Sequence, residues 1–329
     1  MRIYTPAHGA YPDTLIMYGI SKAALYAGTL LCVKGLGSYY EIEVGDLNIL
    51  ASNLAHLINT EGSTIMDEIA KFTQSRERKK LEEALEYLSD TNRCLQFLNS
   101  LTIVGHANSE GRGKEGKSVP LAFIPFAGKY RMGEFKCKEE LYKLCSGCLG
   151  LLSYGFFNGT IRTQQQLFLI ATTVAFEGTV DSNCLRMVLG ALGCSEVGKR
   201  ELKVPLRTLT YIRMSKLGRD VIASLNEANA SWKAITTRFV KEKGVLQVRG
   251  IHELTLDPIL DALSRMRGDD FDTFNKLVEN LVKAENSAAL VYLFDYLSKR
   301  DLDLLAMASR SIYQSFPMGE RLVKILATI

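Results

Sequence analysis

The pattern of apolar and polar positions predicts a mixed arrangement of helices and strands in the first part of the chain. Apolar residues recur at helical spacing over Asp13–Tyr26, and Asp13 is placed to cap that helix. Apolar runs at Leu30–Lys34 and Tyr39–Val44 flank Gly35-Leu36-Gly37, which predicts a β-hairpin. Further helices are expected over residues 46–60, 63–73, 76–99, 138–157, 161–176, 181–192 and 219–230, and further strands over 101–104, 119–126, 204–214 and 245–249.

The C-terminal part of the chain has a helical pattern throughout. Asp257-Pro258 supplies a helix cap followed by proline at the first helical position, and Gly268 ends that helix. Apolar residues between Phe271 and Val282 mark an amphipathic helix, and Asn286, Asp301 and Pro317 start three more. We therefore predict an α+β protein with a mixed N-terminal domain of short strands and helices, residues 1–250, and an all-α helical bundle, residues 251–329.

Residues 105–118 form a Gly/Lys-rich loop that contains a match to the phosphate-binding P-loop pattern. Gly111 is followed, after four intervening residues, by Gly116-Lys117-Ser118. A P-loop opens a helix directly after Lys-Ser, whereas Val119-Pro120 follows here and favours an edge strand. We interpret the segment as a cationic loop between two strands that meets a phosphate backbone. A nucleotide-binding P-loop and a solvated loop without a ligand remain the alternatives.

The distribution of charged residues along the chain is more informative than the net charge. The 329 residues carry a net charge of only +4, with 47% hydrophobic and 23% charged residues, as in ordinary globular proteins. Between Lys199 and Arg249, however, 12 Lys and Arg face 4 acidic residues, whereas residues 250–329 hold 9 against 12. A basic segment beside an acidic one indicates an anionic partner, although a solvated face would show the same composition.

The cysteines and the apolar runs indicate where the protein works. The chain has 7 cysteines, an odd number and mostly in apolar contexts, which favours a reducing compartment over a disulfide framework. The sequence shows no apolar signal segment at its start and no apolar run of roughly eighteen residues, the length that a membrane-spanning helix needs. We expect a cytoplasmic protein that does not contact membranes.

The possible metal ligands give weak signals. The four histidines, His8, His56, His106 and His252, are isolated in the sequence and are expected to be ordinary surface or core residues. Cys145-Ser-Gly-Cys148 has the spacing of half a zinc site, and Cys137 lies eight residues before it, but Cys184 and Cys194 are not spaced as a second pair. Buried thiols are favoured over zinc, so we expect no metal and no cofactor.

The sequence gives no positive reason to call this chain an enzyme. Asp181, Glu201 and Lys203 loosely resemble the carboxylates and lysine of metal-dependent nucleases, in which two carboxylates hold Mg²⁺. Many chains of this size offer such a set. We expect no catalytic residues, and keep a divergent metal-dependent nuclease or a P-loop-like nucleotide-binding enzyme as the alternative.

The remaining hypothesis is a nucleic-acid-binding protein, in which the mixed domain, residues 1–250, is the nucleic-acid-binding domain. Cations beside aromatic residues can follow a phosphate backbone, and an amide can read base edges. Arg207 and Arg213 alternate with apolar residues in the basic segment. The candidate binding residues are Asn108, Arg112, Lys114, Lys117, Lys129, Arg131, Arg207, Arg213 and Lys216.

The N-terminal helix carries a family resemblance. The residues Thr5-Pro6, Asp13-Thr-Leu-Ile-Met-Tyr18-Gly19-Ile-Ser21 and Ala24 resemble the N-terminal helix of large subunits of type I CRISPR interference complexes. The size and the helical end are most similar to the large subunit of the archaeal type I-A complex, known as Cascade. This resemblance implies a non-catalytic member of a ribonucleoprotein complex with crRNA and other CRISPR-associated subunits.

The same resemblance implies particular partners for the chain. It would recognise the short motif beside the target in double-stranded DNA (the PAM), help to open the duplex and contact a nuclease–helicase. Such a division of labour agrees with the physics of guided recognition, in which guide pairing reads most of the sequence. A helical adaptor protein without nucleic-acid contacts is a third possibility.

Overall fold

The structure is a computed structural model of the chain. It describes residues 1–29, 31–104, 106, 117–120, 122–123, 125, 143–165, 168–194, 204–242 and 245–315. The helices are α1 (Ala10–Tyr26), α2 (Leu47–Ala70), α3 (Ser75–Ser89), α4 (Thr91–Ser100), α6 (Ser146–Asn158), α7 (Ser182–Cys194), α8 (Leu206–Ser215), α9 (Arg219–Glu227), α10 (Asp257–Ser264), α11 (Gly268–Lys283), α12 (Ser287–Lys299) and α13 (Leu302–Ser315). The strands are β1 (Arg2–Tyr4), β2 (Cys32–Gly35), β3 (Tyr40–Glu43), β4 (Lys117–Ser118), β5 (Lys143–Leu144), β6 (Ile161–Gln165), β7 (Phe168–Asp181), β8 (Asn229–Glu242) and β9 (Val245–Thr255).

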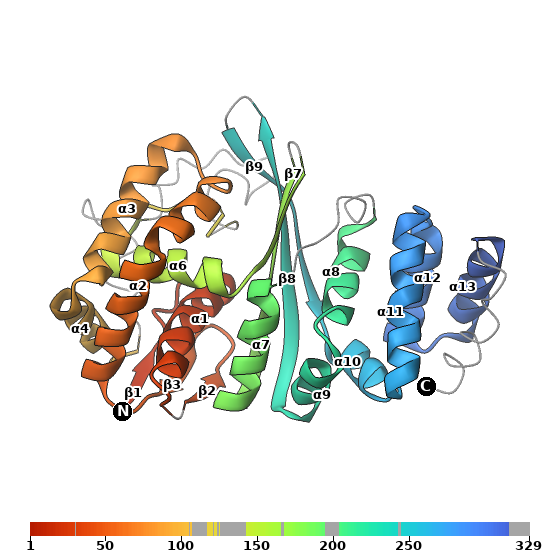
Figure 1. The fold of residues 1–329 in the computed structure, drawn as a ribbon, viewed down its shortest axis with the longest axis horizontal. Helices are drawn as coiled ribbons and strands as arrows, with labels where there is room; N and C mark the ends of the chain where they lie inside the picture. Colours follow the sequence, from red (N-terminus) through yellow and green to blue (C-terminus); the bar gives the residue numbers. More distant parts are fainter. Residues whose placement is uncertain are drawn as a thin grey trace.

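One antiparallel sheet runs through the centre of the molecule. Its strand order is β1-β3-β2-β7-β8-β9, and β6 pairs with the first half of β7 on the same edge that β2 uses further along. The long strands β7 and β8 pair from Phe168↔Val240 to Thr179↔Asn229. They form a twisted ribbon between the N-terminal elements on one side and α8–α13 on the other (Figure 1).

Hydrogen bonds show which elements cover each face of β7 and β8. Tyr18 of α1 donates its hydroxyl proton to the carbonyl of Val174, and Thr173 donates to the carbonyl of Gly159, which follows α6. On the other side, the hydroxyl of Thr210 in α8 bonds to that of Thr236 in β8 at 2.7 Å. Both faces of the ribbon are therefore buried.

A pair of glycines lies near the place where the partner of β7 on this edge changes from β6 to β2. Gly35 of β2 lies opposite Gly178 of β7, which has a φ of +115°. A Cβ on Gly35 would lie 2.1 Å from the carbonyl oxygen of Phe176, and one on Gly178 would lie 2.3 Å from that of Asn229. Only glycine allows three backbones to approach this closely.

The sequence prediction of an α+β fold is confirmed, as are the hairpin β2–β3, the helices α1, α7 and α9, and the C-terminal helices α10 to α13. The short helix expected from Pro317 lies outside the described residues. The expected helices 46–60 and 63–73 are one continuous helix, α2. The expected helix 76–99 divides at Asp90, whose carboxylate accepts a hydrogen bond from the backbone N–H of Arg93 and so caps α4. The helix expected at 138–157 begins instead at Ser146, after the short strand β5.

Four expected elements were wrong in type. The segment 161–176, expected to be helical, forms β6 and most of β7, because a strand buried on both faces shows a continuous apolar run instead of alternation. The segment 204–214, expected to be a strand, contains α8; the Thr210 hydroxyl bonds to the carbonyl of Leu206 one turn earlier. The described residues of 101–104 and 119–126 show turns or irregular backbone instead of strands.

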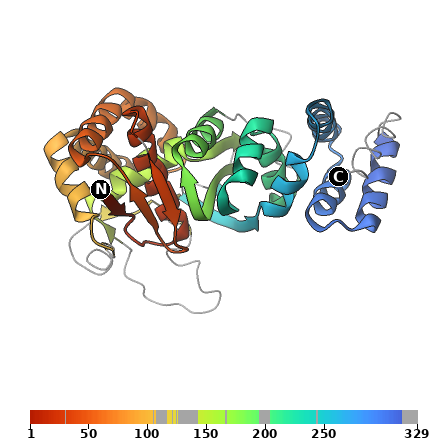
Figure 2. The ribbon, with the colours of Figure 1, turned by 90° about the horizontal axis from the view of Figure 1, so that it is seen from below.

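The hydrophobic core is continuous from one end of the described chain to the other. Buried residues from Ile3 to Ile312 belong to a single contact cluster. Position 250, the expected domain boundary, lies within β9, and α10 follows directly on that strand. Viewed from below, the N-terminal part, the central ribbon with its helices and the group α11–α13 follow one another in a row (Figure 2). Among the described residues, no helix has both the length and the apolar character to cross a membrane.

Candidate nucleic-acid interface

Three lysines gather around one carboxylate on helix α3, and we call Lys79, Lys80, Lys117 and Glu83 the α3 lysine cluster. The Nζ of Lys117 lies 2.6 Å from Oε2 of Glu83, and the Nζ of Lys80 donates to the hydroxyl of Ser118 at 2.5 Å. The hydrogen bond from Lys117 and the charges of all three lysines lower the pKa of the Glu83 carboxyl. The cluster therefore carries more positive than negative charge.

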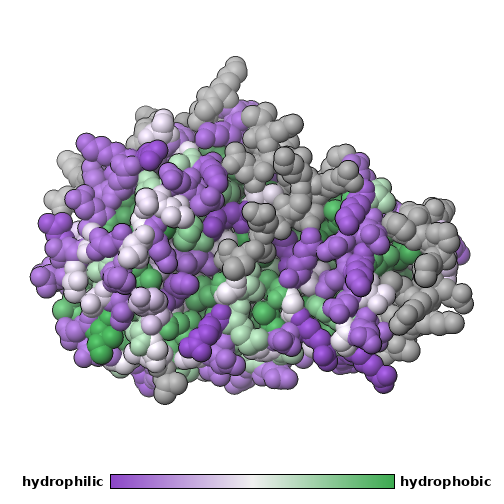
Figure 3. Space-filling view, viewed as in Figure 1, coloured by the Kyte–Doolittle hydropathy of each residue, from purple (hydrophilic) through white to green (hydrophobic). Residues whose placement is uncertain are grey.

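The cluster lies where the chain leaves the Gly/Lys-rich loop. Lys117 and Ser118 form β4, which pairs with β5 in the register Ser118↔Lys143, so a fourth lysine lies across this small ladder. Helix α3 begins with a capping box in which the side chains of Gln74 and Glu77 satisfy the first backbone groups. Hydrophilic residues cover the surface over α3 at the upper left of Figure 3.

The predicted binding residues are not all brought together. Lys117 lies against α3 in the N-terminal part. Arg207 and Arg213 belong to α8, which packs on the opposite side of the central ribbon, and Lys216 is the C-cap residue of that helix. The remaining predicted residues, Asn108, Arg112, Lys114, Lys129 and Arg131, lie outside the described residues.

The prediction of Arg213 as a binding residue is corrected by its burial. Its side chain is only 1% exposed, and its guanidinium donates to the hydroxyls of Thr163 and Thr172 at 2.8 Å each. It also donates to the carbonyl of Ile161. In α8 Arg213 lies on the face that packs against β6 and β7.

Arg207 and Lys216 lie at opposite ends of α8. One guanidinium nitrogen of Arg207 is 3.5 Å from a carboxylate oxygen of Asp295 in α12, and its guanidinium carbon lies 5.7 Å from the ring centre of Tyr211. Burial, and then the charge of Arg207, lower the pKa of His252 in β9. Lys216 is exposed at the end of the helix. Arg207 thus has a structural partner, and Lys216 is the more accessible cation of the two.

Ion pairs neutralise part of the positive charge of the basic segment Lys199–Arg249 among its described residues. Three of its cations pair with carboxylates: Arg207 with Asp295, Lys233 with Glu177 and Glu253, and Arg249 with Glu242. Most of these acids come from outside the segment. The excess of charge counted along the sequence is therefore reduced in space.

The structure describes some of the residues on which an enzymatic function would depend, and their surroundings differ from those that such a function needs. Lys117-Ser118 forms a strand instead of opening a helix, so the context that a P-loop needs is missing there. Asp181 accepts a hydrogen bond from the backbone N–H of Cys184 at 2.9 Å and so caps the start of α7. Glu201 and Lys203 lie outside the described residues.

Sequence reasoning missed two features of this region. Lys79 and Lys80 belong to the run Arg76-Glu-Arg-Lys-Lys80, which could have been recognised from its charge alone. The structure also places His106 beside Cys145 and Cys148, and these three form the one group of three or more possible metal ligands found among the described side chains. No spacing rule joins a histidine to cysteines so far along the chain.

The comparison with known families gives the class of protein to which this fold and basic region belong. A family model described as CRISPR-associated protein (Cas_Csa4) matches residues 1–329. The chain therefore belongs to this family of CRISPR-associated proteins, which agrees with the resemblance of its N-terminal helix to a Cascade-type subunit. No curated protein was found to match the chain.

Proposed function

We propose that the chain is the large subunit of a type I-A CRISPR interference complex, and that it recognises the motif flanking the target in double-stranded DNA. It works beside crRNA and other CRISPR-associated subunits. It also helps to open the duplex and to recruit the nuclease–helicase, and it catalyses no reaction itself. The family match over the whole chain is the observation that carries the proposal.

The α3 lysine cluster supports a contact with a nucleic-acid backbone. Lys79, Lys80 and Lys117 share a single carboxylate, so phosphates can replace or join Glu83 as their partner. The cluster continues along the sequence into the loop that holds Arg112 and Lys114. In guided complexes the protein contributes backbone contacts and short-motif reading, which is what such a cluster and loop can supply.

The first test removes the cluster's charge within the reconstituted complex. Replacement of Lys79, Lys80 and Lys117 by alanine is expected to weaken binding of target duplex DNA. The slope of log affinity against log salt should fall by about one unit for each lost phosphate contact. Binding is measured by filter retention over a salt series, with duplexes that carry a correct or a mutated flanking motif.

A matched variant separates local contact from general charge. Alanine replacements of Lys276, Lys283 and Lys299 remove the same charge from α11 and α12 and should leave the slope unchanged. If both triple variants lose slope equally, or if neither does, the cluster is not a phosphate contact. The Arg112/Lys114/Lys117→Ala variant tests the predicted loop in the same assay.

A further inference from the structure

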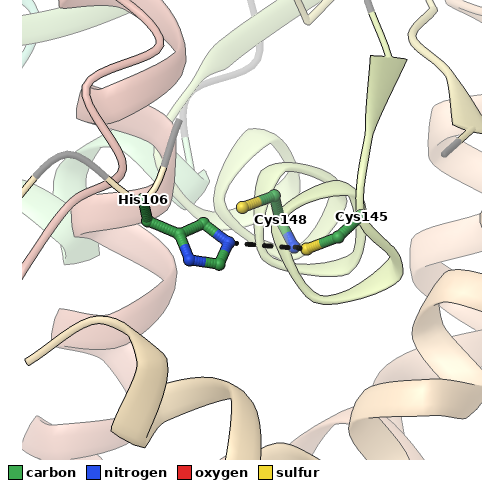
Figure 4. Close-up of side chains that lie close together, drawn as sticks. All are labelled: His106, Cys145 and Cys148. Carbon is green, nitrogen blue, oxygen red and sulfur yellow. Dashed lines mark hydrogen bonds between the residues drawn. The ribbon is translucent and has the colours of Figure 1, made fainter. Parts of the chain in front are cut away.

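Three side chains with metal-binding atoms converge at the base of the Gly/Lys-rich loop. The ligand atoms of His106, Cys145 and Cys148 all lie within 4.8 Å of one another. The Nε2 of His106 is 3.8 Å from the Sγ of Cys145 (Figure 4). The imidazole reaches the two cysteines from a part of the chain that precedes Cys145 by 39 residues.

The separation between the His106 and Cys145 ligand atoms fits a tetrahedral zinc ion. Zinc binds cysteine sulfur at about 2.3 Å and histidine nitrogen at about 2.0–2.1 Å, which places neighbouring ligand atoms roughly 3.5–4 Å apart. The observed separation of 3.8 Å between Nε2 and Sγ lies in this range. Thiolate and imidazole together are a ligand set that favours zinc over the oxygen-seeking metals Mg²⁺ and Ca²⁺.

The local backbone stabilises negative charge on the sulfurs. Cys145 is the N-cap of α6, and its Sγ accepts a hydrogen bond from the backbone N–H of Cys148 at 3.4 Å. Both thiols therefore lie at the positive end of a helix dipole. A zinc ligand must be a thiolate, and helix N-termini favour that form.

Neighbouring elements hold the three ligands in position. The ring of Phe97 in α4 meets the His106 ring edge-on, with 5.8 Å between ring centres. The same phenylalanine lies against Gly147, where a Cβ would come within 2.4 Å of the ring. Glycine at this position between the cysteines lets the start of α6 pack directly on α4.

We propose that His106, Cys145 and Cys148 bind one structural zinc ion. The ion ties the segment after α4 to the start of α6, next to β5, and so closes the base of the Gly/Lys-rich loop. This differs from the sequence-based expectation of no metal, because the histidine could not be paired with the cysteines without the fold. Cys137 lies outside the described residues, and the proposal does not use it.

The first experiment measures metal on the full chain, purified without chelators and separately from any complex, so its result does not depend on the proposed function. Elemental analysis is expected to give about one zinc ion per chain. X-ray absorption at the zinc edge should show at least two sulfur ligands near 2.3 Å and at least one nitrogen near 2.0 Å. Cobalt in place of zinc should give the visible bands of tetrahedral coordination and a thiolate charge-transfer band.

Single substitutions assign the ligands. Cys145→Ser, Cys148→Ser and His106→Gln should each weaken zinc binding by more than the roughly 10–100-fold that loss of an outer partner costs. Serine is a good helix cap, so Cys145→Ser should leave the start of α6 intact. Cys32→Ser, which removes a thiol on β2 outside the group, should keep the metal content of the parent chain.

A second readout keeps the test decisive if a variant folds poorly. In the parent chain, zinc should protect Cys145 and Cys148 from alkylation, and a chelator should expose both at once. A chain that binds no zinc when titrated at micromolar concentration overturns the proposal. So does a Cys145–Cys148 disulfide in protein prepared under reducing conditions, or full metal content in all three ligand variants.

Discussion

Arg207 and Arg213 lie on the same helix, and their surroundings give them different roles. Arg213 is held by two threonine hydroxyls and a backbone carbonyl inside the molecule. Arg207 shares a partly exposed ion pair with Asp295. A buried guanidinium with fixed partners contributes to folding, whereas a partly exposed pair contributes little.

Replacement of Arg213 by alanine is therefore expected to destabilise the protein instead of weakening DNA binding directly. The variant leaves a cavity and removes donors from buried acceptors, so the free energy of unfolding should fall by about 3–5 kcal/mol. Lys216→Ala, at the exposed end of the same helix, should change it by less than about 0.5 kcal/mol. Urea denaturation followed by circular dichroism measures both, and an equal loss in the two variants would contradict this assignment.

At the scale of elements, helices α1 and α6 cross at unusually short range. Gly155 of α6 lies against the backbone of α1, where a Cβ would come within 1.7 Å of the carbonyl oxygen of Leu15. Gly19 of α1 faces the backbone of Leu151 from the other side of the contact. Most residues of the family resemblance belong to α1, which takes part in this contact. The contact also positions Tyr18 of α1, whose hydroxyl bonds to β7.

Replacement of two helical glycines by alanine should change the stability of the protein in opposite directions. Gly155→Ala should lower the free energy of unfolding by about 1–3 kcal/mol or more, because the helices must move apart. Gly190 is exposed in α7, and a Cβ there would meet no atom within 4 Å, so Gly190→Ala should raise it by about 0.5–1 kcal/mol. Thermal or urea unfolding of the two variants compares them directly, and a stable Gly155→Ala protein would show that the crossing has room to spare.

The elements that the sequence predicted best are those with one buried face. The apolar stripe of α11, including Phe271 and Phe274, can be recognised because its other face is polar. Strand β7 was mistaken for a helix because both its faces are covered and no alternation remains. For α8, Thr208 and Thr210 suggested a strand, but both are buried within a helix, and Thr210 contacts the sheet through Thr236.

The candidate site was predictable only in part, for a related reason. The cations of the Gly/Lys-rich loop and of Arg76-Glu-Arg-Lys-Lys80 are visible as charge runs. The meeting of Lys79, Lys80 and Lys117 around Glu83 depends on where β4 docks, and the meeting of His106 with the cysteines depends on packing against Phe97. Contacts between distant segments leave no local pattern in a single sequence.

At the scale of the whole molecule, the ribbon β7–β8–β9 joins the N-terminal elements to the C-terminal helices (Figures 1 and 2). Helix α12 docks on α8 through Phe294, whose ring stacks on Tyr211 with 5.8 Å between ring centres. Phe294 is fully buried and also meets Phe274 of α11 edge-on. Because the core is continuous through these contacts, we expect the described parts to unfold together.

The single tryptophan of the chain offers a test of this coupling. Trp232 lies in β8, 1% exposed, with its ring N–H bonded to the carbonyl of Leu225, so its fluorescence reports on the central region. Phe294→Ala should lower the free energy of unfolding by about 3–5 kcal/mol. In urea, the fluorescence and circular-dichroism transitions should both shift to lower denaturant concentration by the same amount. Tyr313→Ala, at a side chain 43% exposed on α13, should shift neither. If Phe294→Ala produced an early circular-dichroism phase while the Trp232 transition kept its midpoint, the C-terminal helices would be a separate folding unit, as the boundary expected near residue 250 implies.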